Sequence, residues 1–159
     1  MILSTRGRYA VMAMVDLATQ AKEKPTKLAA IAGRQAIPLA YLEQIFARLR
    51  RRGLVASVRG PGGGYLLKRP AAEVRISDII LAAEEPIKMT RCAGEASGCT
   101  TPKIKCLTHD LWEGLGNQIF LYLQSVSLED VCDRRLREKF PDVMNLAVPV
   151  VFGDMTAEH

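Results

Sequence analysis

The N-terminal third of the chain contains segments in which apolar residues recur at the spacing of one helix face. In the first segment, four apolar residues at i, i+3, i+4 and i+7 predict a helix from Ser4 or Thr5 to about Gln20. The residues of this expected buried stripe are Val11, Met14, Val15 and Ala18. Lys24 and Pro25 follow, and a proline interrupts a helix because it has no N–H to donate.

The next two segments predict a pair of helices joined by a short turn. A short helix is expected around 28–34, and a longer one begins near Pro38 and ends at Gly53. The longer helix would bury Leu42, Ile45, Phe46 and Leu49. Its opposite side would expose Tyr41, Glu43, Gln44, Ala47 and Arg51. The pair predicts a helix-turn-helix, although amphipathic helix pairs are common and this pattern alone is weakly specific.

A predicted β-hairpin follows the helix pair directly. Leu54–Arg59 and Tyr65–Lys68 are short β-prone runs, and the proline and four glycines of Gly60–Gly64 predict a turn between them. A strand, a glycine-rich turn and a strand directly after a helix-turn-helix form a wing. Basic residues on its flanks, including Arg59 and Arg69, favour DNA binding over an ordinary hairpin.

The C-terminal half contains a short and a long predicted helix. The short one, at 76–85, would bury Ile76, Ile79, Ile80 and Ala83. The long one runs from Leu107 to about Ser125, and its C-terminal half is apolar on nearly every side. Its main stripe comprises Leu107, Leu111, Leu115, Ile119 and Tyr122. One small core cannot cover every side of such a helix, so a second copy of the chain is the expected cover and we predict a homodimer.

The end of the chain carries weaker patterns. Ser127–Lys139 is expected to form a final helix that turns Leu128, Val131, Cys132 and Leu136 inward. The predicted fold is mainly α with a small β wing. Its parts are a winged helix-turn-helix DNA-binding domain (1–86), a cysteine-rich cluster-binding loop (87–106), dimerisation and C-terminal helices (107–140) and a flexible tail (141–159).

Charge is distributed unevenly. Residues 1–70 contain 13 Lys and Arg against 3 Asp and Glu, whereas residues 71–159 contain 9 against 14, so the first part carries +10 and the second −5. This asymmetry predicts a polyanionic partner for the first part only. The residues expected to neutralise DNA phosphates are Lys27, Arg34, Arg48, Arg50, Arg51, Arg52, Lys68 and Arg69.

Sequence would be read by residues that reach base edges. These are chiefly Tyr41, Glu43 and Gln44 on the longer helix of the pair, while Arg59 is placed to enter a minor groove from the wing. Glu43 would either select against sites that lack a hydrogen-bond donor or pair with a nearby arginine.

Composition excludes several classes of protein. The chain has no run of 18 apolar residues and no secretory signal peptide, so we expect a cytoplasmic protein with no membrane partner and with reduced cysteines. It carries no nucleophile motif, no paired carboxylates in a loop near a histidine and no phosphate-binding loop. An enzyme or a cluster carrier is therefore disfavoured.

Three cysteines and a histidine form a candidate metal-binding set, namely Cys92, Cys99, Cys106 and His109. Because Cys106 and His109 lie three residues apart at a predicted helix start, both side chains can face one point. The set suits zinc or an iron–sulfur cluster, and the absence of a tight Cys-x2–4-Cys pair favours the cluster. A thiol switch without metal is the third interpretation. Cys132 is expected to be a small core residue.

These motifs together resemble the bacterial winged-helix family of iron–sulfur cluster-sensing transcription regulators. The similarity extends from about Leu3 to Val131, and the combination is far more specific than the glycine-rich wing alone. It is densest in Gly7–Val11, Tyr41–Gln44, Gly53–Val55, Ser57–Leu67 and Cys106–Trp112.

The resemblance implies one [2Fe–2S] cluster per subunit, supplied by the cluster-assembly machinery and held by Cys92, Cys99, Cys106 and His109. It also implies a homodimer through the long helix 107–125 and repression of cluster-assembly genes by the cluster-bound form. The cluster-free form would bind a second class of sites, with Glu43 helping to discriminate the two classes. The DNA-binding residues expected on this basis are Tyr41, Glu43, Gln44, Arg51, Arg59, Gly62 and Gly63.

The sequence therefore predicts a regulator of promoter operators, mainly a repressor, whose [2Fe–2S] occupancy alters its DNA-site preference. A single histidine ligand would make the cluster labile, because protons compete for the imidazole, and lability suits a sensor. The alternative is a winged-helix regulator that responds to zinc or to thiol redox without a cluster.

Overall fold

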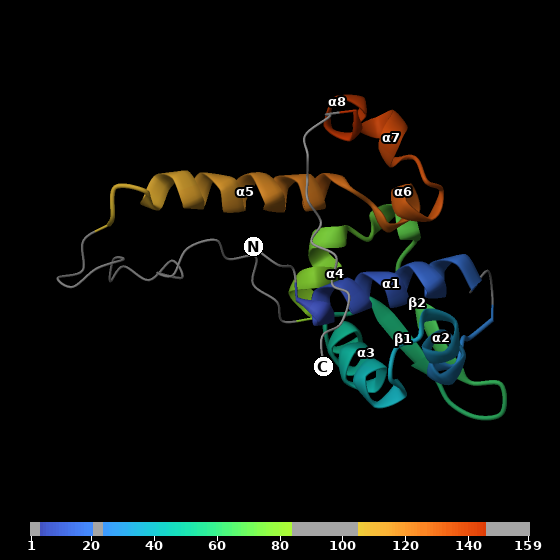
Figure 1. Cartoon of the computed structure of the whole chain (residues 1–159). Helices are drawn as coiled ribbons and strands as arrows, with labels where there is room; N and C mark the ends of the chain where they lie inside the picture. The colour runs from blue at the N-terminus through green and yellow to red at the C-terminus, as the bar shows by residue number, and fades with distance from the viewer. Residues whose placement is uncertain (1–3, 21–23, 84–104, 146–159) are drawn as a thin grey trace, which may run out of the picture.

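The structure, a computed structural model, describes residues 4–20, 24–83 and 105–145 (Figure 1). Its first part confirms the predicted helix-turn-helix and wing. In chain order the elements are α1 (Thr5–Gln20), α2 (Leu28–Gln35), α3 (Leu39–Arg51), β1 (Val55–Val58), β2 (Gly64–Leu67), the 3-10 helix η1 (Ala71–Glu73) and α4 (Ile76–Ala82). The fold is mainly α with one small antiparallel sheet, as the sequence predicts.

The core lies where α1, α3 and α4 meet. The predicted stripe of α3 is confirmed, since Leu42, Ile45, Phe46 and Leu49 are all buried, and so is the stripe of α4. The predicted stripe of α1 is confirmed at Met14, while its other three residues pack against the edge of the core. The residues of α1 that are fully buried are Ala10, Ala13, Met14 and Leu17, whereas Val11, Val15 and Ala18 are only partly buried. Helix α1 contacts α2, α3, α4 and α6, so more than one of its faces is covered, and its fully buried residues include the small Ala10 and Ala13.

An ion pair joins α1 to α2. The buried Asp16 carboxylate accepts hydrogen bonds from Nη2 of Arg34 at 2.6 Å, from Nε of Arg34 at 3.0 Å and from Nε2 of Gln35 at 2.8 Å. Burial would raise the pKa of Asp16, but these hydrogen bonds and the charge of Arg34 outweigh it and lower the pKa. Arg34, which the sequence assigns to a DNA phosphate, is engaged by Asp16 but its side chain is 39% exposed, so that assignment stays a prediction.

The wing is packed against the chain that precedes α2. Strands β1 and β2 pair antiparallel, with Val55 opposite Leu67. On the other edge of β2, Thr26 and Tyr65 exchange two backbone hydrogen bonds of 2.9 and 2.8 Å. A Cβ at Gly64 would lie 2.5 Å from the backbone of Thr26, so this close approach requires glycine.

The second part of the chain contains α5 (His109–Ser125), α6 (Leu128–Cys132), α7 (Leu136–Lys139) and α8 (Pro141–Met144). Helix α5 extends past the rest of the molecule, with α4 beneath it and α6 to α8 at its C-terminal end (Figure 1). No helix among the residues described is both long enough and apolar enough to cross a membrane.

One prediction about this second part is wrong, and another can be compared with the structure only in part. The helix expected over Ser127–Lys139 is two short helices, because Arg134 adopts a positive φ of 58° and the chain turns there. The tail expected from 141 begins with a helical turn, α8, and its residues 146–159 lie outside the described part of the chain.

We expect Gly64→Ala to lower the free energy of unfolding by about 1–3 kcal/mol, because the added methyl group meets the backbone of Thr26 and forces it to shift. Urea unfolding followed by circular dichroism measures the change. Gly33→Ala is the matched control: nothing lies within 4 Å of the new Cβ, and alanine within α2 should stabilise by about 0.5–1 kcal/mol. A Gly64→Ala protein as stable as the parent would contradict the close packing.

We expect Arg34→Met to lower the urea midpoint at neutral pH, because it leaves the buried Asp16 carboxylate without its cation. Since the folded pKa of Asp16 lies below its unfolded value, the stabilisation is present above about pH 4 and is lost as the pH falls through the folded pKa. The difference between parent and variant should therefore be largest near pH 7 and shrink in acid. A difference that is constant across pH would rule out this ion pair as its source.

Candidate DNA interface and metal-binding residues

The turn between α2 and α3 fixes how the second helix of the pair is presented. Ala36 adopts the left-handed conformation with a φ of 52°, and Ile37 is 3% exposed and anchors the turn in the core. Pro38 occupies the N-cap position of α3, where the lack of an N–H costs nothing. The first turns of α3 therefore present Glu43 and Gln44 to solvent, as the sequence predicts.

Tyr41 differs from its prediction, because it is half-buried rather than exposed. Its ring meets the ring of Tyr9 edge to face, with centroids 5.8 Å apart. Tyr41 thus braces α3 against α1. Glu43, by contrast, makes no ion pair with any residue in the described ranges, so the interpretation that it pairs with a nearby arginine finds no support there.

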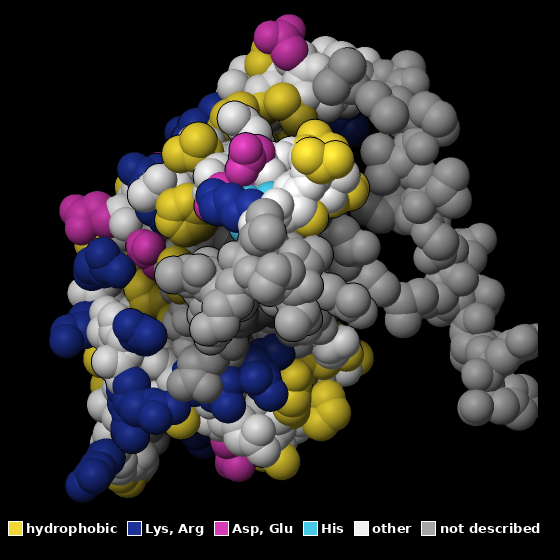
Figure 2. Space-filling model, turned by 90° about the vertical axis from the view of Figure 1, so that its left-hand side faces the viewer, with side chains coloured by type: hydrophobic (Ala, Val, Ile, Leu, Met, Phe, Trp, Pro, Cys, Tyr) yellow, Lys and Arg dark blue, Asp and Glu magenta, His cyan; other side chains and the backbone are white. Residues whose placement is uncertain are grey.

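Arginines crowd the C-terminal end of α3, where the helix dipole favours cations. Arg48 donates to the carbonyl oxygen of Ala83 at 3.0 Å, and Arg50 lies 3.4 Å from Oγ of Ser57. A depression of about 340 Å³ is lined by Arg48, Arg51, Arg52 and Ala82. Figure 2 shows Lys and Arg side chains gathered over the lower half of one face of the molecule. This part of the surface can attract a polyanion.

The tip of the wing is a tight glycine turn. Gly60 and Gly62 adopt φ values of 99° and 78°, which favour glycine. The backbone N–H of Gly63 donates to the carbonyl oxygen of Gly60 at 2.9 Å. A Cβ at Gly63 would clash with the carbonyl oxygen of Val58. The compact turn leaves Arg59 and Gly62 exposed and Gly63 half-buried, so Arg59 can reach a groove beside the turn.

Cys106 and His109 lie at the start of α5. His109 is the first residue of the helix, and its side chain is 9% exposed. The backbone N–H of His109 donates to the carbonyl oxygen of Cys106 at 3.0 Å. Cys106 is half-buried, with Sγ 3.6 Å from Oγ1 of Thr108. The other two members of the predicted set, Cys92 and Cys99, lie outside the residues that the structure describes.

Two carboxylates that the sequence pattern did not indicate, those of Asp110 and Glu113, lie near the His109 side chain. Oε2 of Glu113 lies 3.6 Å from Nε2 of His109, and the donor atoms of His109, Asp110 and Glu113 all lie within 4.8 Å of one another. Nζ of Lys105 lies 3.9 Å from Asp110 and 4.0 Å from Glu113 and supplies the opposing charge. The i,i+4 spacing of His109 and Glu113 on one helix is the sequence feature that could have identified the contact.

Cys132 lies apart from this site. It is half-buried in α6, and its Sγ is 4.0 Å from the carbonyl oxygen of Val15. Burial, together with the charge of Asp133, raises the pKa of the Cys132 thiol and keeps it protonated. These surroundings fit the predicted structural role.

Comparisons with known proteins agree with this architecture. The family model Rrf2, described as iron-dependent transcriptional regulator, matches residues 3–134. The HTH-type transcriptional regulator IscR of Photorhabdus laumondii is 49% identical over 135 residues, which span 85% of this chain and 81% of the relative.

Two solved structures support the same assignment. The structure of T. potens IscR is 36% identical, with a TM-score of 0.69 over 85% of this chain and 88% of its own. CymR of B. subtilis, described as the global cysteine regulator, is 32% identical, with a TM-score of 0.70 over 84% of this chain and 98% of its own. The chain belongs to the Rrf2 family of iron-dependent transcriptional regulators, and it is a winged-helix DNA-binding protein.

Proposed function

We propose that the protein senses iron–sulfur cluster status and acts mainly as a repressor of cluster-assembly genes. In this proposal one [2Fe–2S] cluster per subunit is held by Cys92, Cys99, Cys106 and His109. The main observation in its favour is that Cys106 lies just before α5 and accepts, at its carbonyl oxygen, the backbone N–H of the buried His109, the first residue of the helix, in a family described as iron-dependent.

The donor set fits such a group in its chemistry. Thiolates and one imidazole match iron–sulfur ligation, and burial restricts the orientations that His109 can adopt. Cys106 lies just before the N-terminus of α5, where the positive end of the helix dipole stabilises a thiolate. When bound, the cluster would supply a redox-active iron centre whose occupancy responds to iron supply and to oxidants.

The DNA contacts of the proposal come from α3 and the wing. Glu43 and Gln44 are exposed and can reach base edges, and Arg59 can enter a minor groove beside Gly62 and Gly63. Arg51 would contact phosphates, and the half-buried Tyr41 would position α3 as well as contact DNA. The partner is double-stranded promoter DNA, and Glu43 would favour sites that offer a donor such as cytosine N4.

The proposed assembly is a homodimer through the long helix 107–125. Large apolar side chains on α5 are exposed in the single chain: Leu111 by 64%, Leu121 by 53% and Trp112 by 43%. A second copy of the same helix would cover this apolar surface symmetrically. The protein would act in the cytoplasm, where the cluster-assembly machinery would load it.

We expect the double substitution Leu111→Arg with Leu115→Arg to give a monomer in sedimentation velocity, because it places charge on the exposed apolar surface of α5. Binding to an operator with two half-sites should weaken at least about 10-fold, because a monomer cannot bind both half-sites at once. Asn117→Arg, exposed on the same helix, is the control for added charge. A double variant that sediments as a dimer would contradict an interface on α5.

Anaerobic reconstitution with iron and sulfide tests the cluster itself. We expect visible charge-transfer bands, two irons per subunit and different DNase footprints for the loaded and metal-free forms. His109→Cys should retain the cluster longer during exposure to a chelator, because a thiolate replaces a neutral ligand. Cys132→Ser, outside the proposed ligand set, should behave as the parent.

The same preparation separates the alternatives. A colourless protein with stoichiometric zinc would favour a zinc-responsive regulator, and one with neither metal but with altered DNA binding on oxidation would favour a thiol switch. If Cys106→Ala retained iron and both footprints, the proposed ligand set would be wrong.

A further inference from the structure

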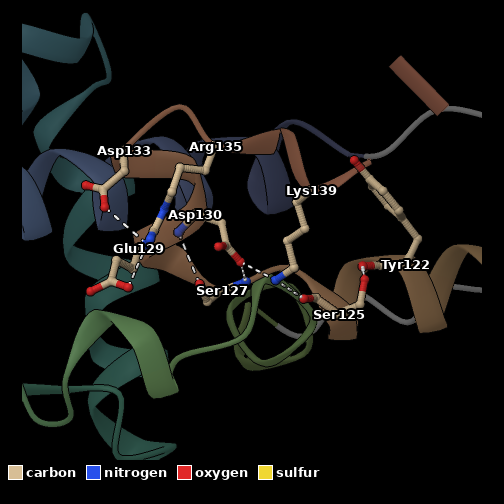
Figure 3. A network of polar contacts seen from close by, with 8 residues as sticks. All are labelled: Tyr122, Ser125, Ser127, Glu129, Asp130, Asp133, Arg135 and Lys139. Carbon is tan, nitrogen blue, oxygen red and sulfur yellow. Dashed lines mark hydrogen bonds and ion pairs between the residues drawn. The ribbon is translucent and has the colours of Figure 1, made fainter. Parts of the chain in front are cut away.

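A lysine from α7 holds the C-terminal end of the long helix. Nζ of Lys139 donates to the carbonyl oxygen of Ser125, the last residue of α5, at 2.8 Å and to Oδ2 of Asp130 at 2.6 Å (Figure 3). An ammonium group at this end of a helix stabilises carbonyls that have no partner within the helix. Lys139 therefore ties α5 to α6.

Asp130 is fixed from the other side by the backbone. Its Oδ2 accepts the N–H of Ser127 at 2.9 Å, and its own N–H donates to Oγ of Ser127 at 3.1 Å, which forms a capping box at the start of α6. The hydrogen bond from Lys139, followed by that from the backbone of Ser127, holds the pKa of Asp130 far below its usual value. The carboxylate is thus charged whenever the protein is folded near neutral pH.

The same few residues carry the connection to the DNA-binding part. The N–H of Ile76 donates to Val126 at 3.0 Å, and the N–H of Leu128 donates to Val74 at 2.8 Å. The C-terminal end of α5, which we call its base, is therefore hydrogen-bonded to the segment that links η1 to α4. This bond lies one residue after Ser125, whose carbonyl oxygen accepts from Lys139. Lys139 acts where the long helix joins the DNA-binding part.

A second set of contacts braces α6 against α7. Nη2 of Arg135 lies 2.7 Å from Glu129 and 3.1 Å from Asp133, as Figure 3 shows. The rings of Tyr122, in α5, and Phe140 lie with their centroids 5.1 Å apart. These contacts bring Lys139 back toward α5.

We propose that Lys139 is a positioning residue that fixes the angle between α5 and the DNA-binding part, and thereby sets the half-site spacing that the dimer accepts. The inference rests on the proposed dimerisation through α5. Helix α5 has 17 residues and is about 25 Å long, so a rotation of about 10° at its base moves its far end by about 4 Å. That displacement is close to one base-pair step of about 3.4 Å.

The test measures the affinity for two-half-site operators whose spacing is varied by one to three base pairs, together with the affinity for a single half-site. We expect the parent to prefer one spacing and Lys139→Met to reduce that preference by about 5- to 10-fold, on the scale of about 1 to 1.4 kcal/mol. Its affinity for the single half-site should be unchanged. Arg137→Met is the matched control, because Arg137 lies exposed on the same helix and outside this network.

Two further variants keep the test decisive if Lys139→Met folds poorly. Lys139→Arg retains a cationic donor and should restore much of the spacing preference, and Asp130→Asn should broaden it as Lys139→Met does. A parent that shows no preferred spacing would refute both the dimer and this role. A parent with a clear preference that Lys139→Met and Asp130→Asn leave unchanged would refute the role of Lys139 alone.

Discussion

Two backbone hydrogen bonds hold the C-terminal helices to the winged helix. They join Val74–Ile76 to Val126–Leu128, and the apolar side chains on both sides are buried, with Val74 and Leu128 fully inaccessible. Because both partners are backbone groups in a water-free environment, breaking this bridge would leave unsatisfied donors and acceptors. This short antiparallel contact connects α5 to the DNA-binding part, although its two sides are about 50 residues apart in the chain.

Cations from other elements complete the ends of two helices. Arg48 of α3 donates to Ala83 at the end of α4, and Lys139 of α7 donates to Ser125 at the end of α5. Each contact satisfies a carbonyl that its own helix leaves without a partner. The Arg48 contact also connects elements with different roles. It joins α3, the helix proposed to read DNA, to α4, and α4 packs against α5. Helix α4 is thus in contact with both α3 and the helix that begins at His109.

The sequence predicts most elements of the winged helix because their patterns are local. Helix α3 faces the core on one side and solvent on the other, so its apolar spacing identifies every buried position. Helix α1 is covered on several sides, and spacing alone selects Val11 and Val15 rather than the fully buried Ala10 and Ala13. Gly64 is predicted as part of a turn, but its need for glycine comes from Thr26, which precedes α2.

The candidate sites show the same difference between local patterns, which the sequence predicts, and contacts across the fold, which it does not. Spacing identifies Cys106 and His109 as neighbours at a helix start, and it could have included Glu113. It does not show that residues 127–139 turn at Arg134, or that Lys139 then contacts Ser125 and Asp130. Contacts between residues that are close in sequence are visible in the pattern, whereas those that set the direction of a helix are made across the fold.

The number of basic residues in the N-terminal part overstates how many of them are available to contact DNA. The net charge of +10 over residues 1–70 includes Arg34, whose guanidinium is held by Asp16, and Arg48, which donates to Ala83. A DNA phosphate would have to compete with a buried carboxylate for Arg34, and the released carboxylate would lose its partner. Arg48 keeps its charge beside the neutral carbonyl of Ala83, whereas the charge of Arg34 is offset by the Asp16 carboxylate. The basic residues therefore have two roles, and only those with side chains still able to reach DNA contribute to salt-dependent affinity.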